Sequence, residues 1–170
     1  MKIKKPNKIV AGVEIIDTSS EGKAVAKIDD LVVFVEGAVP GDTCTIQINR
    51  IKKKFAEAKL ITLEKPSSER IDAICSHFGT CGGCKWQHLN YDSQLKYKQK
   101  HVSDALKRIG KVEVGNFKPI IGAKEIYNYR NKLEFTFSAN IWLTKEEISI
   151  GKEFNRNALG FHIPGLFDKI

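Results

Sequence analysis

The stretch Ala24-Val-Ala-Lys-Ile28-Asp-Asp-Leu31-Val-Val-Phe-Val35 contains two short runs of strand-forming residues joined by an acidic turn. Runs of this length, bounded by turn residues, predict β-strands. Pro40-Gly41-Asp42 supplies a further turn. Three similar runs predict strands at residues 9–16, 43–51 and 56–63. Five short strands in this part of the chain favour a small barrel of the OB type.

The predicted strand at residues 43–51 alternates polar and apolar side chains, as a half-buried strand does. Cys44 belongs to its apolar set, together with Ile46 and Ile48. Because unpaired cysteine is among the most buried residue types, we expect Cys44 to be a buried thiol of the barrel core.

The run Lys52-Lys53-Lys54 predicts a hairpin loop between the last two strands of the barrel. By composition alone it is a solvated hairpin. Folds of the OB type carry nucleic-acid-binding loops at this position, which makes the three lysines candidate RNA-binding residues. Both interpretations stay open at the level of sequence.

Composition and charge limit the class of protein. With 42% hydrophobic and 28% charged residues among 170, the chain has the composition of a folded globular protein. Its net charge of +8 favours an anionic partner such as nucleic acid, although many small proteins are basic for no specific reason. No apolar run approaches the ~20 residues of a membrane span. We therefore expect a cytoplasmic protein with reduced thiols and no membrane partner.

Three of the four cysteines lie in Cys75-Ser-His-Phe-Gly-Thr-Cys81-Gly-Gly-Cys84-Lys-Trp-Gln-His88, with the spacing Cys-x5-Cys-x2-Cys. Glycines among them allow the backbone to wrap tightly, so that several thiolates can be aimed at one point. Such a loop suits a metal ion or an iron–sulfur cluster. The fourth ligand is open: His88 would suit zinc, Cys44 lies in a predicted strand, or the ligand is missing.

A helix is predicted after the cysteine loop, because apolar residues recur there at helical spacing. Asn90 or Asp92 can cap its start, and Gly110 suits its C-terminal end. Its predicted apolar face consists of Tyr91, Leu95, Val102, Ala105, Leu106 and Ile109. Its polar side carries three candidate RNA-binding residues, Lys96, Lys100 and Lys107. A solvated surface helix explains this basic face equally well.

The last part of the chain returns to a β pattern. Leu133-Glu-Phe-Thr-Phe-Ser138 alternates strictly and predicts a strand, and residues 158–163 predict another. Residues 144–152 look like an exposed connection. The stretch Tyr127-Asn-Tyr-Arg130-Asn131-Lys132 mixes aromatic, amide and cationic groups as single-stranded RNA sites do, so Arg130 and Lys132 are candidate RNA-binding residues. An ordinary strand start is the alternative.

The cysteine motif, with Gln87 and His88 after it, resembles that of the iron–sulfur-containing RNA uracil-5-methyltransferases, most closely the 23S ribosomal RNA enzymes. Three further stretches are similar to this family in the same order. They are Glu21–Lys27 with Val33–Asp42, similar to the TRAM domain, Tyr91–Ile109, and Tyr129–Ser138. The resemblance implies an α+β, mostly β chain with a TRAM barrel at residues 1–65, a cluster loop and basic helix at 66–111, and a truncated β-rich central domain at 112–170.

The resemblance also implies a [4Fe–4S] cluster held by Cys75, Cys81 and Cys84. The family's fourth ligand is a cysteine that follows a stretch like Leu159–Asp168, and no cysteine follows Cys84 here. No glycine-rich cofactor loop for S-adenosylmethionine is found either. We therefore expect an N-terminal fragment, a monomer that binds ribosomal RNA, with an incomplete cluster and without methyltransferase activity of its own.

Two other classes compete with this interpretation. A stand-alone RNA-binding module would hold structural zinc with Cys75, Cys81, Cys84 and His88, since zinc accepts three cysteines and one histidine. Radical methylthiotransferases also combine TRAM domains with iron–sulfur clusters. Their radical-cluster motif has three residues in its first gap, however, whereas this loop has five.

Overall fold

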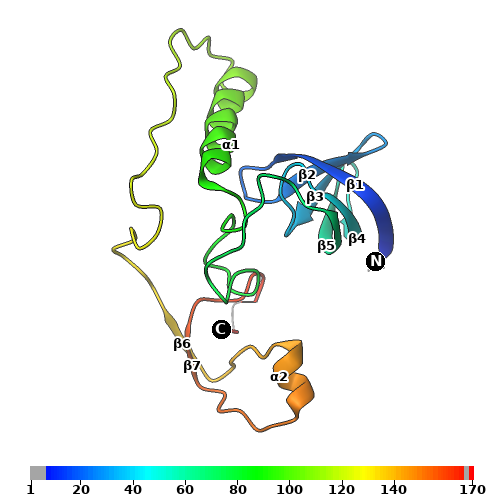
Figure 1. Cartoon of the computed structure of the whole chain (residues 1–170), viewed down its shortest axis with the longest axis vertical. Helices are drawn as coiled ribbons and strands as arrows, with labels where there is room; N and C mark the ends of the chain where they lie inside the picture. Colours follow the sequence, from blue (N-terminus) through cyan, green and yellow to red (C-terminus); the bar gives the residue numbers. More distant parts are fainter. Residues whose placement is uncertain (1–6, 167–168) are drawn as a thin grey trace. The chain divides into compact units, whose positions relative to one another are not determined.

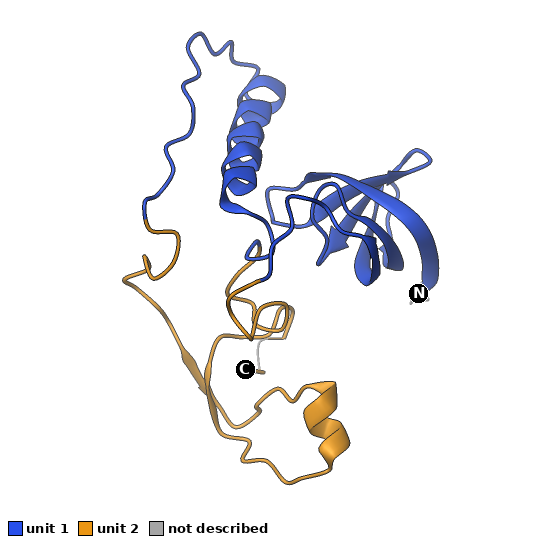
Figure 2. Ribbon diagram, viewed as in Figure 1, with its two compact units in different colours: residues 1–72, 86–124 blue, residues 73–85, 125–170 orange. Residues whose placement is uncertain are grey.

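The computed structural model describes residues 7–166 and 169–170. It divides into two compact units (Figure 2): unit 1 contains residues 1–72 and 86–124, and unit 2 contains residues 73–85 and 125–170. The first six residues of the predicted TRAM domain, and residues 167–168 at the end of the chain, lie outside the described part. Within that part, no helix is long and apolar enough to cross a membrane.

Unit 1 contains the predicted five-stranded barrel (Figure 1). Its strands close in the order β1-β2-β3-β5-β4, with β3 and β5 parallel and the other pairs antiparallel. This is the arrangement expected of an OB-like barrel and confirms the predicted fold class. The strands are β1 (Lys8–Thr18), β2 (Ala24–Ile28), β3 (Leu31–Glu36), β4 (Thr43–Ile51) and β5 (Phe55–Lys65).

Strand alternation builds the barrel core. Val33 and Val35 of β3 and Ala56 of β5 are all 0% exposed, and their sequence neighbours point outward. Cys44 is also 0% exposed, and its thiol donates to the Val13 carbonyl oxygen at 3.6 Å. Burial raises the pKa of this thiol to about 11. Cys44 is therefore the core thiol that its strand position predicted.

A long helix follows the cysteine loop, as predicted, and packs on the barrel within unit 1. Helix α1 (Tyr91–Asp104) begins at the N-cap Asn90, whose side chain accepts from the Ser93 N–H at 2.8 Å. A wider π-helical turn, η1 (Ala105–Ile109), continues it. Gly110 ends the helix with φ −70°, so it does not adopt the left-handed C-terminal conformation that glycine favours.

The predicted apolar face of this helix is not its buried face. Ser93 and Tyr97 are the buried residues of α1, whereas Val102 is 52% exposed and Ile109 is 82% exposed. The prediction was wrong because the helix meets the rest of unit 1 through another face, on which Tyr97 packs with Val39 and Leu89 and polar groups form hydrogen bonds. Tyr97 Oη donates to Glu69 Oε2 at 3.1 Å, and His101 Nε2 donates to the carbonyl oxygen of Thr18 at 2.9 Å.

Unit 2 contains less regular structure than its sequence pattern predicted. Strands β6 (Thr136–Ser138) and β7 (Ala158–Gly160) form a two-stranded antiparallel sheet. Each covers only half of the predicted strand: β6 the second half of 133–138, and β7 the first half of 158–163. The predicted exposed connection contains helix α2 (Lys145–Ile150). This helix begins with a capping box, because Thr144 accepts from the Glu147 N–H and Glu147 accepts from the Thr144 N–H.

Candidate nucleic-acid interface and cysteine loop

The loop between β4 and β5 exposes its three lysines at one end of the barrel. Lys52, Lys53 and Lys54 are all exposed, and a backbone hydrogen bond of 2.8 Å from Lys52 N to Phe55 O closes the turn. The Lys52 ammonium lies 4.6 Å from the centre of the Phe55 ring. The structure thus combines three cations with an aromatic ring, a pairing that suits single-stranded nucleic acid.

The lysines of helix α1 are less available than the sequence suggested. Lys96 Nζ lies 3.1 Å from Glu69 Oε1, and Lys100 Nζ lies 2.7 Å from Asp17 Oδ2 and 2.9 Å from Asp104 Oδ2. The hydrogen bond to Asp17, followed by the one to Asp104, raises the pKa of Lys100. Lys96 and Lys100 of α1 therefore pair with carboxylates of other segments, Glu69 and Asp17, while Lys107 of η1 is exposed and forms no ion pair with any residue that the structure describes.

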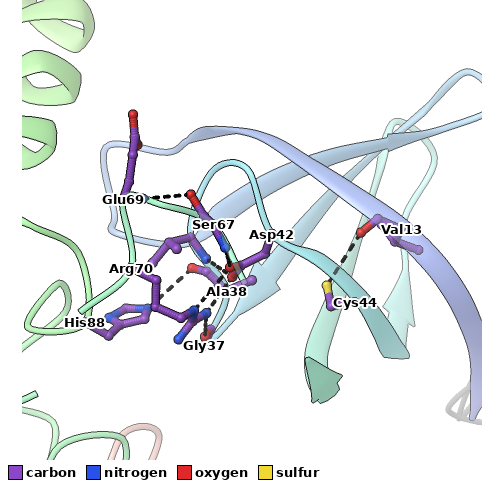
Figure 3. Close-up of polar contacts among 10 residues, drawn as sticks. Val13, Gly37, Ala38, Asp42, Cys44, Ser67, Glu69, Arg70 and His88 are labelled. Atoms are coloured by element: carbon purple, nitrogen blue, oxygen red, sulfur yellow. Dashed lines mark hydrogen bonds and ion pairs between the residues drawn. The ribbon is translucent and has the colours of Figure 1, made fainter. Parts of the chain in front are cut away.

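A buried ion pair that sequence reasoning missed fixes the segment between the barrel and the helix (Figure 3). The Asp42 side chain is 0% exposed and accepts from Arg70 Nε at 3.1 Å and Ser67 N at 2.9 Å through Oδ1. Its Oδ2 accepts from Arg70 Nη2 and from the Val39 N–H at 2.8 Å. Arg70 Nη2 also donates to the Gly37 carbonyl oxygen at 3.1 Å. Residues 67–70, which follow β5, are thus anchored on the barrel.

The charge state of Asp42 follows from this network. Burial on its own raises the pKa of a carboxyl group, but the hydrogen bonds from Arg70, Val39 and Ser67 outweigh it, and the pKa of Asp42 is lowered from 3.8. Asp42 is therefore an ionised, fully hydrogen-bonded carboxylate. The sequence places Asp42 in a turn and Arg70 after the last predicted strand of the barrel. It does not show that these two residues pair.

His88 and Trp86 belong to unit 1 and face the barrel. His88 is 7% exposed, and its Nε2 lies 3.4 Å from the Ala38 carbonyl oxygen. Burial, followed by the nearby Arg70 charge, lowers the pKa of His88, so the neutral ring is favoured. Trp86 Nε1 donates to the Gly22 carbonyl oxygen at 3.1 Å. Both residues thus join the helix segment to the barrel.

The cysteine loop belongs to unit 2, where it contacts the residues that follow β7. Gly82 N donates to the His162 carbonyl oxygen at 3.1 Å, and a Cβ at Gly82 would lie 2.6 Å from that oxygen. Gly83 N donates to the Cys81 sulfur at 3.3 Å. Glycine is therefore required at position 82 because another backbone lies against it.

The three thiols of this loop fit an iron–sulfur cluster in their chemistry but are not assembled as a metal site. Cys75 and Cys84 are exposed and Cys81 is half-buried. Among residues 7–166 and 169–170, no group of three or more His, Cys, Asp or Glu side chains is arranged to hold a metal ion. Thiolates on a glycine-rich loop suit iron, and the amide that donates to Cys81 would stabilise a bound thiolate. The cluster stays a prediction.

The remaining predicted RNA-binding residues lie in unit 2. Arg130 and Lys132 are both exposed, and Lys132 Nζ lies 3.2 Å from Glu134 Oε1. A surface ion pair of this kind is weak, so it leaves the lysine able to exchange its partner.

Comparison with known proteins identifies the class to which this architecture belongs. The sequence model of the TRAM domain matches residues 10–61, which span nearly the whole barrel. Over 161 residues, 92% of this chain, 49% of positions are identical to a protein of Porphyromonas gingivalis named as an RNA methyltransferase. A similarly named protein of Bacteroides thetaiotaomicron is 51% identical over 153 residues. The chain is thus a TRAM-containing relative of the RNA methyltransferases.

Two further similar proteins carry more specific names. Over 118 residues, 69% of this chain and 26% of the relative, 36% of positions are identical to the 23S rRNA (uracil(1939)-C(5))-methyltransferase RlmD of Legionella pneumophila. This confirms the resemblance to the RNA uracil-5-methyltransferases. A solved structure of a Pyrococcus abyssi tRNA (uracil-54, C5)-methyltransferase with S-adenosyl-L-homocysteine matches with a TM-score of 0.45 and 28% identity, covering 76% of this chain and 27% of that one.

The chain spans about a third of the length of the two bacterial relatives, 35% and 34% respectively. Most of the length of those two proteins therefore lies outside the match.

Proposed function

We propose that the chain is the RNA-binding part of an S-adenosylmethionine-dependent methyltransferase that forms 5-methyluridine in 23S ribosomal RNA in the cytoplasm. The observation that carries this proposal is the continuity of the match: the TRAM match at residues 10–61 lies within a longer match, over 92% of the chain, to a protein named as an RNA methyltransferase. The RlmD relative supports ribosomal RNA as the substrate.

The role of the described residues in this reaction is to hold RNA. Carbon C5 of uracil becomes nucleophilic only after a thiolate adds to C6, and a base must later remove the C5 proton. We assign those two groups to the part of the enzyme that this chain does not span. The exposed cations of the barrel, Lys52, Lys53 and Lys54, would bind phosphates and so orient the strand.

The cysteine loop completes the proposal. Cys75, Cys81 and Cys84 would hold three corners of a [4Fe–4S] cluster, and the fourth ligand would come from elsewhere in the enzyme. The donor chemistry and the Gly83 amide directed at the Cys81 sulfur support this assignment. A cluster in this place would stabilise the loop against its neighbouring backbone. Stoichiometric zinc without sulfide in anaerobically isolated full-length protein would contradict it.

RNA binding by the chain tests the role of the lysine loop. We expect a 23S rRNA segment to bind less tightly as salt rises, and the triple change of Lys52, Lys53 and Lys54 to Ala to reduce the slope of log K against log salt by about 2. The matched control replaces Lys118, Lys124 and Lys145, three exposed lysines, with Ala and removes the same charge. Equal slopes for the two variants would refute the assignment of the loop.

Deletion of the gene tests the substrate. We expect one or more 5-methyluridines to disappear from 23S ribosomal RNA, as measured by mass spectrometry of nuclease fragments. Loss from transfer RNA with ribosomal RNA unchanged would overturn the choice of substrate and keep the class of enzyme.

A further inference from the structure

Two phenylalanines lie on the outer surface of the barrel and contact each other. Phe34 of β3 and Phe55 of β5 have ring centres 5.5 Å apart and ring planes at 77°. Their neighbours Val33 and Ala56 are 0% exposed, so strand alternation places both phenylalanine rings outside. Each is half-buried, and neither belongs to the core cluster of the barrel. Core packing therefore does not account for this pair.

The Lys52 ammonium lies next to one ring of this pair. Lys52 Nζ lies 4.6 Å from the centre of the Phe55 ring, and Lys52 itself is exposed. A lysine that reaches the ring from solvent shows that the ring is accessible to a ligand from solvent. Cation–π attraction at an exposed site is weaker than the stacking of a nucleobase on an aromatic ring. A base can therefore displace the ammonium, which then becomes available to a phosphate.

Helix α1 restricts where RNA can approach the barrel. Trp86, which precedes α1, donates to the Gly22 carbonyl oxygen in the β1–β2 loop, and His101 of α1 donates to the Thr18 carbonyl oxygen beside it. This loop precedes β2, whose first residue pairs with the end of β3. Because Val32 near the start of β3 pairs with Phe55, the lysine loop lies at the opposite end of the barrel. The start of β5, with Phe55, and the lysine loop thus lie at the end of the barrel opposite the one that the α1 segment covers.

The charges around the pair favour a polyanion. Glu57, which follows Phe55 on the same side of β5, lies 3.7 Å from Lys23, and Asp30 lies 3.9 Å from Lys27. These two carboxylates are therefore partly neutralised by lysines. Among the described residues, no carboxylate lies within ion-pair distance of Lys52, Lys53 or Lys54, so the charge of these three cations is unbalanced.

We propose that Phe34 and Phe55 form a stacking platform for an unpaired RNA base, with Lys52–Lys54 on the phosphates next to it. The proposal rests on the proposed function, because it takes RNA as the ligand. Aromatic rings stack on any base, but only where the base is not already stacked inside a duplex. The platform would thus select single-stranded or looped RNA next to the target uracil without reading its sequence.

Binding of two fluorescent oligoribonucleotides to the whole chain tests the platform. One RNA is a mixed single strand, and the other has the same backbone but abasic sites in its centre. We expect the double variant Phe34→Leu, Phe55→Leu to bind the intact strand about 10-fold more weakly, because leucine keeps the apolar volume and loses the stacking face. Its salt slope should equal that of the wild type, and its affinity for the abasic strand should be unchanged.

Phe137→Leu is the matched control, since Phe137 is 82% exposed and lies in unit 2. The variants Phe34→Tyr and Phe55→Tyr should restore binding. If the double variant binds the intact strand like the wild type, or weakens both strands equally, the platform is refuted while lysine-dependent binding leaves the proposed function standing. If the wild-type chain binds neither strand, both proposals fall.

Discussion

At the scale of single residues, the Asp42 carboxylate organises the junction between the barrel and the segment that follows it. It accepts hydrogen bonds from two backbone amides and from the Arg70 guanidinium, although Arg70 lies 28 residues further along the chain (Figure 3). A buried carboxylate is tolerated only when its lone pairs are satisfied in this way. Arg70 thereby holds residues 67–70 on the barrel, where β5 ends.

The first prediction concerns this ion pair. Replacement Arg70→Ala should lower the free energy of unfolding by about 3 kcal/mol, because a buried charge loses its partner. Urea unfolding followed by tryptophan fluorescence measures the change. The exposed Arg50 provides the control: Arg50→Ala should change stability by less than about 0.5 kcal/mol. Equal effects of the two substitutions would show that the Asp42 network contributes nothing specific.

A second prediction follows from the lowered pKa of Asp42. The folded state binds this proton less readily than the unfolded chain, so the contribution to stability is complete above the unfolded value of about 3.9. It should be lost as the pH falls through the lower folded value. Urea midpoints between about pH 6 and pH 2 should therefore converge for the wild type and Asp42→Asn. Parallel curves would contradict the depressed pKa.

The role of a single residue could be predicted where it depends on its neighbours in the sequence. Cys44 was correctly predicted as a core thiol, because the alternation of its own strand places it inside. The Asp42–Arg70 pair was not predicted, since no local pattern connects a turn residue with an arginine 28 residues further along the chain. The same limit applies to Lys96 and Lys100, whose carboxylate partners Glu69 and Asp17 belong to other segments.

At the scale of elements, helix α1 is held on the barrel by an aromatic residue with a polar end. Tyr97 is 6% exposed and donates to Glu69, and burial followed by the Glu69 charge raises the pKa of its hydroxyl. The chain beyond the helix returns along it, since the Tyr91 hydroxyl accepts from the Ala123 N–H at 2.7 Å. The helix is therefore bound on two sides within unit 1.

The third prediction tests this attachment. Replacement Tyr97→Ala should cost about 3 kcal/mol, because it removes a buried aromatic ring and its hydrogen bond. Amide hydrogen exchange should become faster throughout α1, while the barrel amides of β3 and β5 keep their protection. Val102→Ala, at a position 52% exposed on the same helix, is the control and should leave exchange nearly unchanged. Uniform acceleration in the barrel would show that the two elements unfold as one.

The helix also shows why periodicity alone chose the wrong face. The spacing of Leu95, Val102 and Ile109 predicted helix, and helix is present. Which side is buried depends on the surface that the helix meets, and there Thr18 of β1 and Glu69 of the segment after β5 offer hydrogen-bonding groups. Polar residues therefore face the contact, and part of the apolar stripe remains exposed.

At the scale of the whole molecule, the two units differ in how much structure supports them. Unit 1 has a closed barrel with a buried core, whereas the sheet of unit 2 has two strands of three residues each. Isolated two-stranded sheets are marginally stable in water. Phe137, 82% exposed, and Leu159, 57% exposed, further show that this sheet buries little of its apolar surface.

The fourth prediction is the order of limited proteolysis. Trypsin should cut first after Arg130 or Lys132, which are exposed and lie outside helices and strands. The lysine loop at 52–54 should resist longer, because a closed barrel cannot offer the extended backbone that a protease needs. Mass spectrometry of early fragments should find the barrel and α1 intact in one piece. Early cleavage after Lys53 would contradict the stability assigned to the barrel.

The sequence by itself determined the five strands of the barrel, the position of the helix and the spacing of the cysteines, because period-two alternation, helix caps and short motifs are local properties. Only the tertiary structure decided which face of α1 is buried, that Asp42 pairs with Arg70, and that Phe34 meets Phe55 on the outside of the barrel. These choices join residues that are far apart in sequence. Their outcome depends on which surfaces the closed barrel presents, and no local pattern encodes that.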